Sequence, residues 1–423
     1  MGGVAKHMSH IWEDLDITFG DIKEIFTKAS EGTLEAFEKV DGINSHFTMG
    51  TGSSVKFARN STDIKGGGIN LKELKIRYYN HAAENQFTQG SAAVCEFLKE
   101  TWWPLGFSSK NWVNCEIVFS PQPQTIKYSG NWIIMHEAAA FDTKGHKAQI
   151  NLDSRFNKLV NSFDDTSVVH KDLEWNIRGP IRVHLQPTNG DGIFCEAEKG
   201  LSKILAASNL SWDSSIRDYA AVALASGRIS SLRIPEAKKQ QIISLVLEEP
   251  GALRLIDIKK GLPKNIAASL SQIAVKKNRG KLISEATAPI EFIVTRFGAR
   301  ILENCTSALV EDPSGEAVRI WSEIETARSL IETTVDGYEN ARAQLLESYA
   351  SKLDAVDIPP VALEGIVFTH QDKKYKMTGT FAIANQILGI SKYGRGGIPP
   401  IGDVDLAADA ASALAVLKGM GAF

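Results

Sequence analysis

The spacing of apolar residues changes from a helix period to a strand period and back again along this chain, and this change limits the folds open to it. Apolar residues at helical spacing first predict a helix over residues 19–29. Residues 45–57 and 111–135 then carry alternating, β-branched and aromatic runs, as antiparallel strands do. Residues 197–356 return to helical spacing, and residues 361–381 to strands. The sequence therefore predicts an α+β protein in which a helical domain is inserted into a β domain.

The predicted domain boundaries follow these changes of period. The β domain takes residues 8–196 and 357–423, and the helical insertion takes residues 197–356. One amphipathic face of the insertion continues to Ile331 and Val335. An alanine-rich stretch at residues 403–417 predicts one more packed helix near the end of the chain.

A hairpin is predicted where the strand pattern returns. Residues 361–369 and 374–381 read as its two strands, with the tip near Gln371 and Asp372. Lys374 and Lys376 are two positions apart on the second strand, so their side chains point to the same face. An exposed edge strand protected by lysines would show the same pattern.

Composition limits the class of protein. The chain has 423 residues, of which 43% are apolar and 23% charged, which is typical of a globular protein of about two domains. Four cysteines lie far apart, without the pairing of a zinc site or a disulfide framework, and this favours a reducing cytoplasm. The sequence has no apolar run of the roughly 18 residues that a membrane span needs, so we expect no membrane partner.

Charge is distributed unevenly over the helical middle. The net charge of −3 gives no overall attraction to nucleic acid, so a polyanion site has to be a local patch. Residues 251–300 hold ten Lys or Arg against three acids, while residues 301–356 hold eleven acids against four bases. The candidate nucleic-acid surface consists of Lys259, Lys260, Lys264, Lys276, Lys277, Arg279 and Lys281. An ordinary solvated helix face remains the alternative for these residues.

Five short segments with chemically useful residues occur in a fixed order. They are residues 38–42 (Glu-Lys-Val-Asp-Gly), 59–60 (Arg-Asn), 115–118 (Cys-Glu-Ile-Val), 363–367 (Leu-Glu-Gly-Ile-Val) and 374–376 (Lys-Tyr-Lys). Each is unremarkable alone, and their order makes the pattern specific. Together they supply a lysine beside Asp-Gly, two glutamates on strand-like runs and a late lysine pair. A protein that takes a nucleoside monophosphate onto its own lysine needs these groups.

The five segments resemble motifs I, Ia, III, IV and V of the covalent nucleotidyltransferase superfamily, which includes ATP-dependent DNA ligases, RNA ligases and messenger RNA capping enzymes. The resemblance covers residues 12–145 and 359–397. It is closest to the RNA ligase 2 branch, because Asn44 stands where DNA ligases commonly have an arginine. The opening also resembles phage ligase-like proteins. The implied fold is an adenylation domain of two antiparallel sheets with flanking helices around a nucleotide cleft.

The resemblance implies a role for the lysines. Lys39 would attack the α-phosphorus of ATP as a neutral amine, so we expect its pKa to be lowered by Mg²⁺, by the later lysines and by partial desolvation. Asp41 would orient the amine or the leaving group, and Gly42 would let the backbone approach the phosphate. Lys374 and Lys376 would contact the α-phosphate and stabilise the charge that develops on it.

The other matched residues would bind the nucleotide. Glu116 and Glu364 suit Mg²⁺ or Mn²⁺ as hard oxygen ligands, and Glu116 would alternatively contact the ribose. Arg59 would hold the ribose or a 5′-phosphate, and Glu38 would read the base or orient Lys39. Asn44 belongs to the same nucleotide-binding set. His136 stands where the family usually has an aromatic ring that stacks on the base, and a structural histidine is an equal alternative there.

The implied activity is that of an ATP-dependent polynucleotide ligase with a lysyl-AMP intermediate, with RNA favoured over DNA as acceptor. Too few residues follow Lys376 for a five-stranded oligonucleotide-binding barrel, which also favours an RNA ligase. A DNA ligase, a guanylyltransferase, or a non-catalytic nucleic-acid-binding or virion-assembly protein remain alternatives. We expect ATP, a divalent cation and nucleic acid as ligands, no evident protein partner, and location in the cytoplasm, which is the host's if the chain is phage-encoded.

Overall fold

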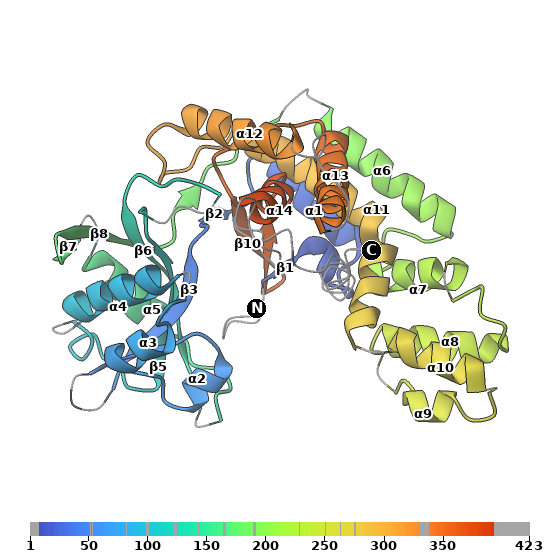
Figure 1. Ribbon diagram of the computed structural model, residues 1–423, viewed down its shortest axis with the longest axis horizontal. Helices are drawn as coiled ribbons and strands as arrows, with labels where there is room; N and C mark the ends of the chain where they lie inside the picture. Colours follow the sequence, from blue (N-terminus) through green and yellow to red (C-terminus); the bar gives the residue numbers. More distant parts are fainter. Residues whose placement is uncertain are drawn as a thin grey trace.

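The protein is a mixed α+β structure with two β-sheets, as the sequence predicts at that level (Figure 1). The computed structural model describes residues 8–392 except 51, 53, 82, 99–100, 122–124, 143, 164–165, 189–191, 228, 250, 263, 275 and 330–337. The helix predicted over residues 403–417 lies outside the described residues, as do Ile331 and Val335. Among the described residues, no helix is both long and apolar enough to cross a bilayer.

The first sheet has five strands in the order β1-β11-β10-β2-β9. Its strands are β1 (Ser9–His10), β2 (Ala36–Lys39), β9 (Arg182–Val183), β10 (Gly365–His370) and β11 (Lys373–Met377). The predicted hairpin is confirmed as β10 and β11, and Gln371 and Asp372 at its tip both have positive φ. Strand β2 pairs antiparallel with β10, so that Lys39 lies opposite Gly365.

The second sheet has six strands in the order β4-β3-β5-β6-β8-β7. Its strands are β3 (Ile43–Met49), β4 (Val55–Ala58), β5 (Asn111–Val118), β6 (Asn131–Ala140), β7 (Ser167–His170) and β8 (Leu173–Arg178). Strand β5 pairs with β3, and this places Glu116 opposite Asn44.

The expectation of purely antiparallel sheets is wrong at two places. Strand β1 runs parallel to β11, and β6 runs parallel to β8. The segment between β6 and β8 forms α5 and β7 on the same sheet, and most of the chain separates β1 from β11, so no local turn reveals either parallel pair. The β7–β8 hairpin, which turns at Lys171 and Asp172 with positive φ, was also not expected from the sequence.

Helices cover the outer faces of both sheets. The second sheet packs against α3 (Leu71–Arg77), α4 (Glu84–Leu98) and α5 (Asp153–Asn161). The short helix α2 (Ser61–Lys65) instead packs through Ile64 in a separate small cluster with Ala58, Trp112, Ala139 and Phe141. The first sheet packs against α1 (Phe19–Ser30), α6 (Ile193–Ser208) and α11 (Lys276–Glu303). The helix predicted over residues 19–29 is confirmed as α1, and a capping box between Thr18 and Asp21 begins it.

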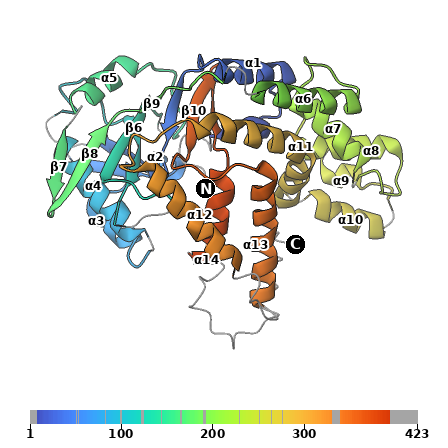
Figure 2. The ribbon, with the colours of Figure 1, turned by 90° about the horizontal axis from the view of Figure 1, so that it is seen from above.

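A third group of helices joins the two sheets. It consists of α12 (Pro313–Ser329), α13 (Tyr338–Val356) and α14 (Phe381–Lys392). These helices share a core with Val40, which follows β2, and with Val118 and Ile134 of the second sheet. Figure 2 shows α12, α13 and α14 on the opposite side of the molecule from α1 and α6.

The predicted helical middle is helical, but its helices pack in different places. Only α7 (Ile216–Ser226), α8 (Glu236–Val246), α9 (Leu255–Ile258), α10 (Lys264–Ala274) and the start of α11 share a core of their own. They form a lobe away from the sheets (Figure 1). The other helices of residues 197–356 pack against the two sheets or connect them.

Candidate functional site

A cavity of about 480 Å³ lies between the inner faces of the two sheets. Strands β2, β10 and β11 line it from the first sheet, and β3, β5 and β6 line it from the second. The residues predicted from the sequence that line it are Glu38, Lys39, Asn44, Glu116, His136, Lys374 and Lys376. Segments more than 300 residues apart therefore meet at one cavity, because β2 pairs with β10.

Lys39 and Glu364 form an ion pair at this cavity. The pair results from strand register, since Lys39 ends β2 opposite Gly365, the residue after Glu364. The Glu364 side chain is 8% exposed and the Lys39 side chain 25%. The carboxylate is therefore enclosed, while the amine still reaches the cavity.

The charge state of Lys39 differs from the one expected. Burial acts to lower the pKa of the amine, but the nearby carboxylates of Glu364, Glu116 and Asp41 outweigh it and raise the pKa above its ordinary value of 10.5. The expectation of a lowered pKa is therefore wrong for the protein by itself. Three acidic groups hold the proton on the amine more strongly than the partly buried Lys376 repels it.

Glu364 carries one oxygen that is available for a ligand. Burial raises the pKa of this carboxyl to about 7, although Lys39 acts in the opposite direction. One oxygen, Oε1, accepts from Lys39. The other, Oε2, is buried and has no hydrogen-bond partner among the residues that the structure describes. A buried carboxylate oxygen without a partner is costly unless something binds it.

Glu116 lies across the cavity from β10, on β5. Its Oε2 is 3.5 Å from Asn44 Nδ2 and 3.8 Å from His136 Nε2, so both contacts are long. Asn44 Nδ2 also donates to Asn114 Oδ1 at 3.0 Å. Asn114, which the sequence analysis missed, is two residues before Glu116 and therefore faces the same cavity.

Gly42 is required by strand packing. A Cβ at this position would lie 2.8 Å from Glu116 Cγ and 2.8 Å from the Ile117 carbonyl oxygen, and real Cβ atoms do not approach that closely. The structure thus gives this glycine a role other than the expected close approach to a phosphate. It lets the chain after β2 pass directly beside β5, next to Glu116.

The backbone at Asp41 is anchored by a buried tyrosine that the sequence analysis also missed. The Asp41 N–H donates to Tyr128 Oη at 2.7 Å, and Asp41 Oδ2 accepts from the Thr125 N–H at 3.4 Å. Burial and the charge of Asp41 raise the pKa of Tyr128, so its hydroxyl stays neutral. Tyr128 thus fixes the turn that follows Lys39.

Lys374 and Lys376 both point into the cavity from β11, as predicted. Lys374 Nζ lies 2.6 Å from Glu137 Oε2, and Lys376 is 9% exposed. Burial lowers the pKa of Lys376, and the charge of Lys39 adds to this effect. The expected convergence of these two lysines with Lys39 and Glu364 is therefore present.

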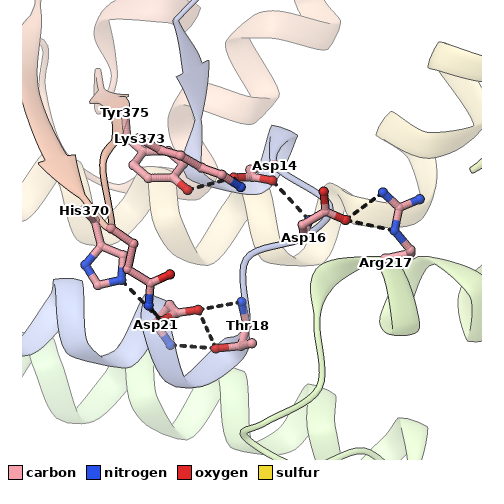
Figure 3. A network of polar contacts seen from close by, with 9 residues as sticks. Asp14, Asp16, Thr18, Asp21, Arg217, His370, Lys373 and Tyr375 are labelled. Atoms are coloured by element: carbon pink, nitrogen blue, oxygen red, sulfur yellow. Dashed lines mark hydrogen bonds and ion pairs between the residues drawn. The ribbon is translucent and has the colours of Figure 1, made fainter. Parts of the chain in front are cut away.

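The outer face of β11 is fixed by a separate polar network (Figure 3). Asp14 Oδ2 accepts from Tyr375 Oη at 2.7 Å and from Lys373 Nζ at 2.8 Å. On the neighbouring strand, His370 Nε2 lies 3.3 Å from Asp21 Oδ1. These contacts hold the outward residues of the hairpin, whose inward residues are the two cavity lysines.

Two further predicted residues have contacts that bear on their roles. Glu38 alternates with Lys39 on β2, and its carboxylate accepts from Ser307 Oγ and from the Ala308 N–H. These contacts tie β2 to the segment before α12, and burial raises the pKa of Glu38. His136 lies on β6 beside Glu116, with its side chain 29% exposed to the cavity.

Arg59 lies outside the lining of the main cavity. Its guanidinium carbon is 4.9 Å from the centre of the Phe87 ring, and its backbone N–H donates to Asp63 Oδ2 at 3.0 Å. It lines a separate space of only about 10 Å³. The structure therefore does not bring Arg59 together with Lys39.

The basic residues of the helical middle have mostly local contacts where their side chains are described. Lys259 donates to Ser271 Oγ, and Lys260 Nζ lies 3.0 Å from Asp257. Arg279 Nη1 lies 3.2 Å from the Leu245 carbonyl oxygen and 3.2 Å from Glu248. Lys264 and Lys281 are exposed, whereas the side chains of Lys276 and Lys277 lie outside the described part.

Two further missed residues lie at the cavity and beside it. Glu137 lines it from β6, and Lys147 Nζ lies 3.6 Å from Glu137 Oε1. Glu137 could have been noticed as a charged residue in an apolar strand run. Nothing in the sequence singles out Lys147, because it lies in a polar loop that has no periodicity.

In comparisons with known proteins, the chain matches no family model, no curated protein and no solved structure. The two-sheet fold and the cavity are therefore defined by the geometry described above and by no known relative.

Proposed function

We propose that the protein is a covalent nucleotidyltransferase, an ATP-dependent polynucleotide ligase that carries AMP on Lys39 and joins 5′-phosphate to 3′-hydroxyl ends, with RNA as the favoured acceptor. The observation that supports it best is the meeting of Lys39, Glu364, Glu116 and the two lysines of β11 at one cavity. These residues come from three strands of the two sheets, β2, β5 and β11, and from Glu364, which immediately precedes β10. The cavity, at about 480 Å³, is in the range of sites for small ligands.

The first step would be attack of the Lys39 amine on the α-phosphorus of ATP. A nitrogen–phosphorus bond forms, the bond to the β-phosphate oxygen breaks, and pyrophosphate leaves with the electron pair. Lys39 must first lose its proton, and Glu364 is its direct hydrogen-bond partner. Lys374 and Lys376 would offset the negative charge that develops on the phosphoryl oxygens.

The two glutamates fit a divalent cation such as Mg²⁺ or Mn²⁺. Glu364 Oε2 is buried without a partner among the described residues, and the contacts of Glu116 are long. Hard carboxylate oxygens suit these ions. A bound cation would neutralise phosphate charge and weaken the hold of the carboxylates on the Lys39 proton.

In the later steps, AMP would pass from Lys39 to the 5′-phosphate of a polynucleotide, and a 3′-hydroxyl would then displace it. The exposed Lys264 and Lys281 of the helical lobe are candidates for contact with that strand. A DNA ligase and a guanylyltransferase would use the same cavity, and they differ from this proposal in the nucleotide or the acceptor.

A labelling experiment tests the proposal. The protein is incubated with Mg²⁺ and either α-labelled ATP or α-labelled GTP and then denatured, and the label retained on the chain is measured. We expect retention from ATP, loss of retention in Lys39→Ala, and full retention in the control Lys72→Ala, whose lysine is exposed on α3. Label from GTP alone would indicate a guanylyltransferase. Absence of label from both nucleotides, or label that persists in Lys39→Ala, would refute the proposal.

A further inference from the structure

We propose that Lys147 and Lys374 form a subsite for the polyphosphate tail of the nucleotide, and that Glu137 occupies this subsite as a counter-ion until the tail displaces it. The inference rests on the proposed function for the identity of the ligand as a nucleoside triphosphate. It adds to that function a residue, Lys147, that none of the five sequence segments contains.

The first observation is that two ammonium groups converge on one carboxylate. Glu137 Oε2 is 2.6 Å from Lys374 Nζ, and Glu137 Oε1 is 3.6 Å from Lys147 Nζ. Burial acts to raise the pKa of Glu137, but the charges of these two lysines outweigh it and lower the pKa. Glu137 is therefore ionised at neutral pH, and the cluster keeps one excess positive charge.

The second observation is the position of the cluster relative to the cavity. Glu137 and Lys374 line the main cavity, while Lys147 lines a side recess of about 20 Å³ that shares Glu137 and Asn114 with it. That recess holds no more than a water molecule. A phosphate at the mouth of the main cavity would thus face both lysines from outside the recess.

The exposure of the lysine side chains increases from Lys39 to Lys147. The side chains of Lys39 and Lys374, which line the cavity, are 25% and 50% exposed, and that of Lys147, in the adjoining recess, is 60% exposed. The α-phosphate must lie at Lys39, the nucleophile of the proposed reaction. The β- and γ-phosphates then extend outward past Lys374 to Lys147, and the leaving pyrophosphate is already directed toward solvent.

The loop that carries Lys147 is held in place before any ligand binds. The Asp142 carboxylate accepts from the Lys144 and His146 N–H groups, each at 2.8 Å. The Ala148 N–H donates to the Ala140 carbonyl oxygen at 2.8 Å, which closes the loop onto the end of β6. A fixed backbone reduces the entropy that is lost when the lysine is immobilised on a phosphate.

The competing interpretation is an exposed ion pair of little consequence, since most such pairs contribute less than about 1 kcal/mol. The two interpretations predict different effects of Glu137→Gln on anion binding. If Glu137 only pairs with surface lysines, removal of its charge does not change anion binding in the cavity. If it competes with phosphate, its neutralisation makes anion binding tighter.

Binding of inorganic tripolyphosphate, measured by isothermal titration calorimetry in the presence of EDTA, tests the subsite without requiring any covalent chemistry. We expect Lys147→Ala to weaken binding about fivefold to tenfold, Lys147→Arg to retain most of it, and Glu137→Gln to tighten it by about threefold or more. The matched control is Lys144→Ala, which removes an exposed lysine from the same loop.

Three results would overturn the inference: wild-type protein that does not bind tripolyphosphate, Lys147→Ala that binds like Lys144→Ala, or Glu137→Gln that binds more weakly than wild type. Its failure is distinct from failure of the proposed function. Lysine labelling by ATP together with unchanged tripolyphosphate affinity in Lys147→Ala rejects only the subsite. Loss of affinity in Lys147→Ala without any labelling rejects only the transferase and supports the anion site.

Discussion

At the scale of single residues, the cavity is a balance of opposed charges. Three carboxylates keep the proton on Lys39, while Lys376, partly buried nearby, acts against it. For the amine to act as a nucleophile its pKa has to fall, and positive charge nearby would lower it. Under the proposed function, the cation bound with the nucleotide would place positive charge beside the glutamates, and the phosphates would place negative charge beside the lysines. The pKa of Glu364 offers a way to measure these opposed charge effects.

The pH dependence of the unfolding free energy should show the titration of the Glu364 carboxyl group. Its folded-state pKa, about 7, lies above its ordinary value of 4.5, so the folded protein holds the proton more tightly than the unfolded chain. The resulting stabilisation is complete below pH 4.5 and is lost as the pH rises through about 7. We expect the difference in unfolding free energy between wild type and Glu364→Gln to change by on the order of 1 to 3 kcal/mol between pH 4.5 and 8.

Urea unfolding at several pH values measures this difference. Asp257→Asn, at a half-buried carboxylate of the helical lobe, is the control. Lys260 and Arg254 lower the pKa of Asp257, so this variant should show no comparable change near pH 7. Parallel pH profiles for wild type and Glu364→Gln would contradict the assignment.

Tyr128→Phe should destabilise the turn after Lys39. The change removes only the hydroxyl that accepts from the Asp41 N–H, and it leaves this backbone donor without its partner. We expect a loss of about 1 to 2 kcal/mol in unfolding free energy and slower labelling of Lys39 by ATP. Tyr79→Phe, on an exposed tyrosine, should change neither quantity. Equal labelling rates for the two variants would show that the turn does not depend on this hydroxyl.

At the scale of elements, strand pairing brings the site together. The hairpin of β10 and β11 could be predicted because alternating residues flank a polar tip, and the inward direction of Lys374 and Lys376 follows from their spacing. The meeting of Lys39 with Glu364 followed from the order of motifs. The parallel pairs were not predictable, since neither strand carries a sign of its distant partner, and Lys147 was not predictable, since a loop residue has no period.

Gly365→Ala should disrupt the pairing of β10 with β11. A Cβ there would collide with the Met377 carbonyl oxygen and lie 2.9 Å from Thr378 Cα. We expect a loss of about 1 to 3 kcal/mol in stability together with loss of ATP labelling, because Glu364 precedes this residue. Gly280→Ala is the control: a Cβ at Gly280, within α11, would have no atom of the described residues within 4 Å. That change should be neutral or stabilising by up to about 1 kcal/mol.

Thermal unfolding and the labelling assay separate the two glycine variants. If Gly365→Ala retained the stability of the Gly280→Ala control, the close approach of the two strands would not be needed for folding.

At the scale of the whole molecule, the helical lobe has a core of its own, and α7 and α11 connect it to the core of the first sheet. Polar contacts add to this connection. Arg217 on α7 donates to Asp16 Oδ1 through Nε and Nη2, at 3.0 and 2.7 Å, and to the Leu247 carbonyl oxygen through Nη1 at 2.6 Å. The same N-terminal segment carries Asp14, which fixes the outer face of β11 (Figure 3). Helical periodicity predicted the helices of this region, but it did not predict which of them pack on the sheets and which form the lobe. Periodicity shows which face of a helix is apolar, but it does not show which part of the molecule covers that face.

Arg217→Ala should loosen the lobe without affecting the sheets. It removes the contacts to Asp16 and leaves the carbonyl group that ends α8 without its partner. We expect amide hydrogen exchange to become about fivefold faster in α7 and α8 and to stay unchanged in β5 and β6. Arg254→Ala, which removes an exposed arginine of the same lobe, is the control. Equal acceleration in both sheets would show that the lobe and the sheets unfold as one unit.

The pairing of Lys39 with a carboxylate 325 positions later also determines when the cavity can be completed during synthesis of the chain. At ordinary translation speeds, roughly 20 to 60 seconds separate the emergence of the lysine from that of its partner at the ribosome. Until then β2 can pair only with the short strand β9 on one side, and its other edge, which later pairs with β10, has to be kept from aggregating. A product of early termination would contain Lys39 without Glu364, Lys374 and Lys376, and under the proposed function it would not be labelled by ATP.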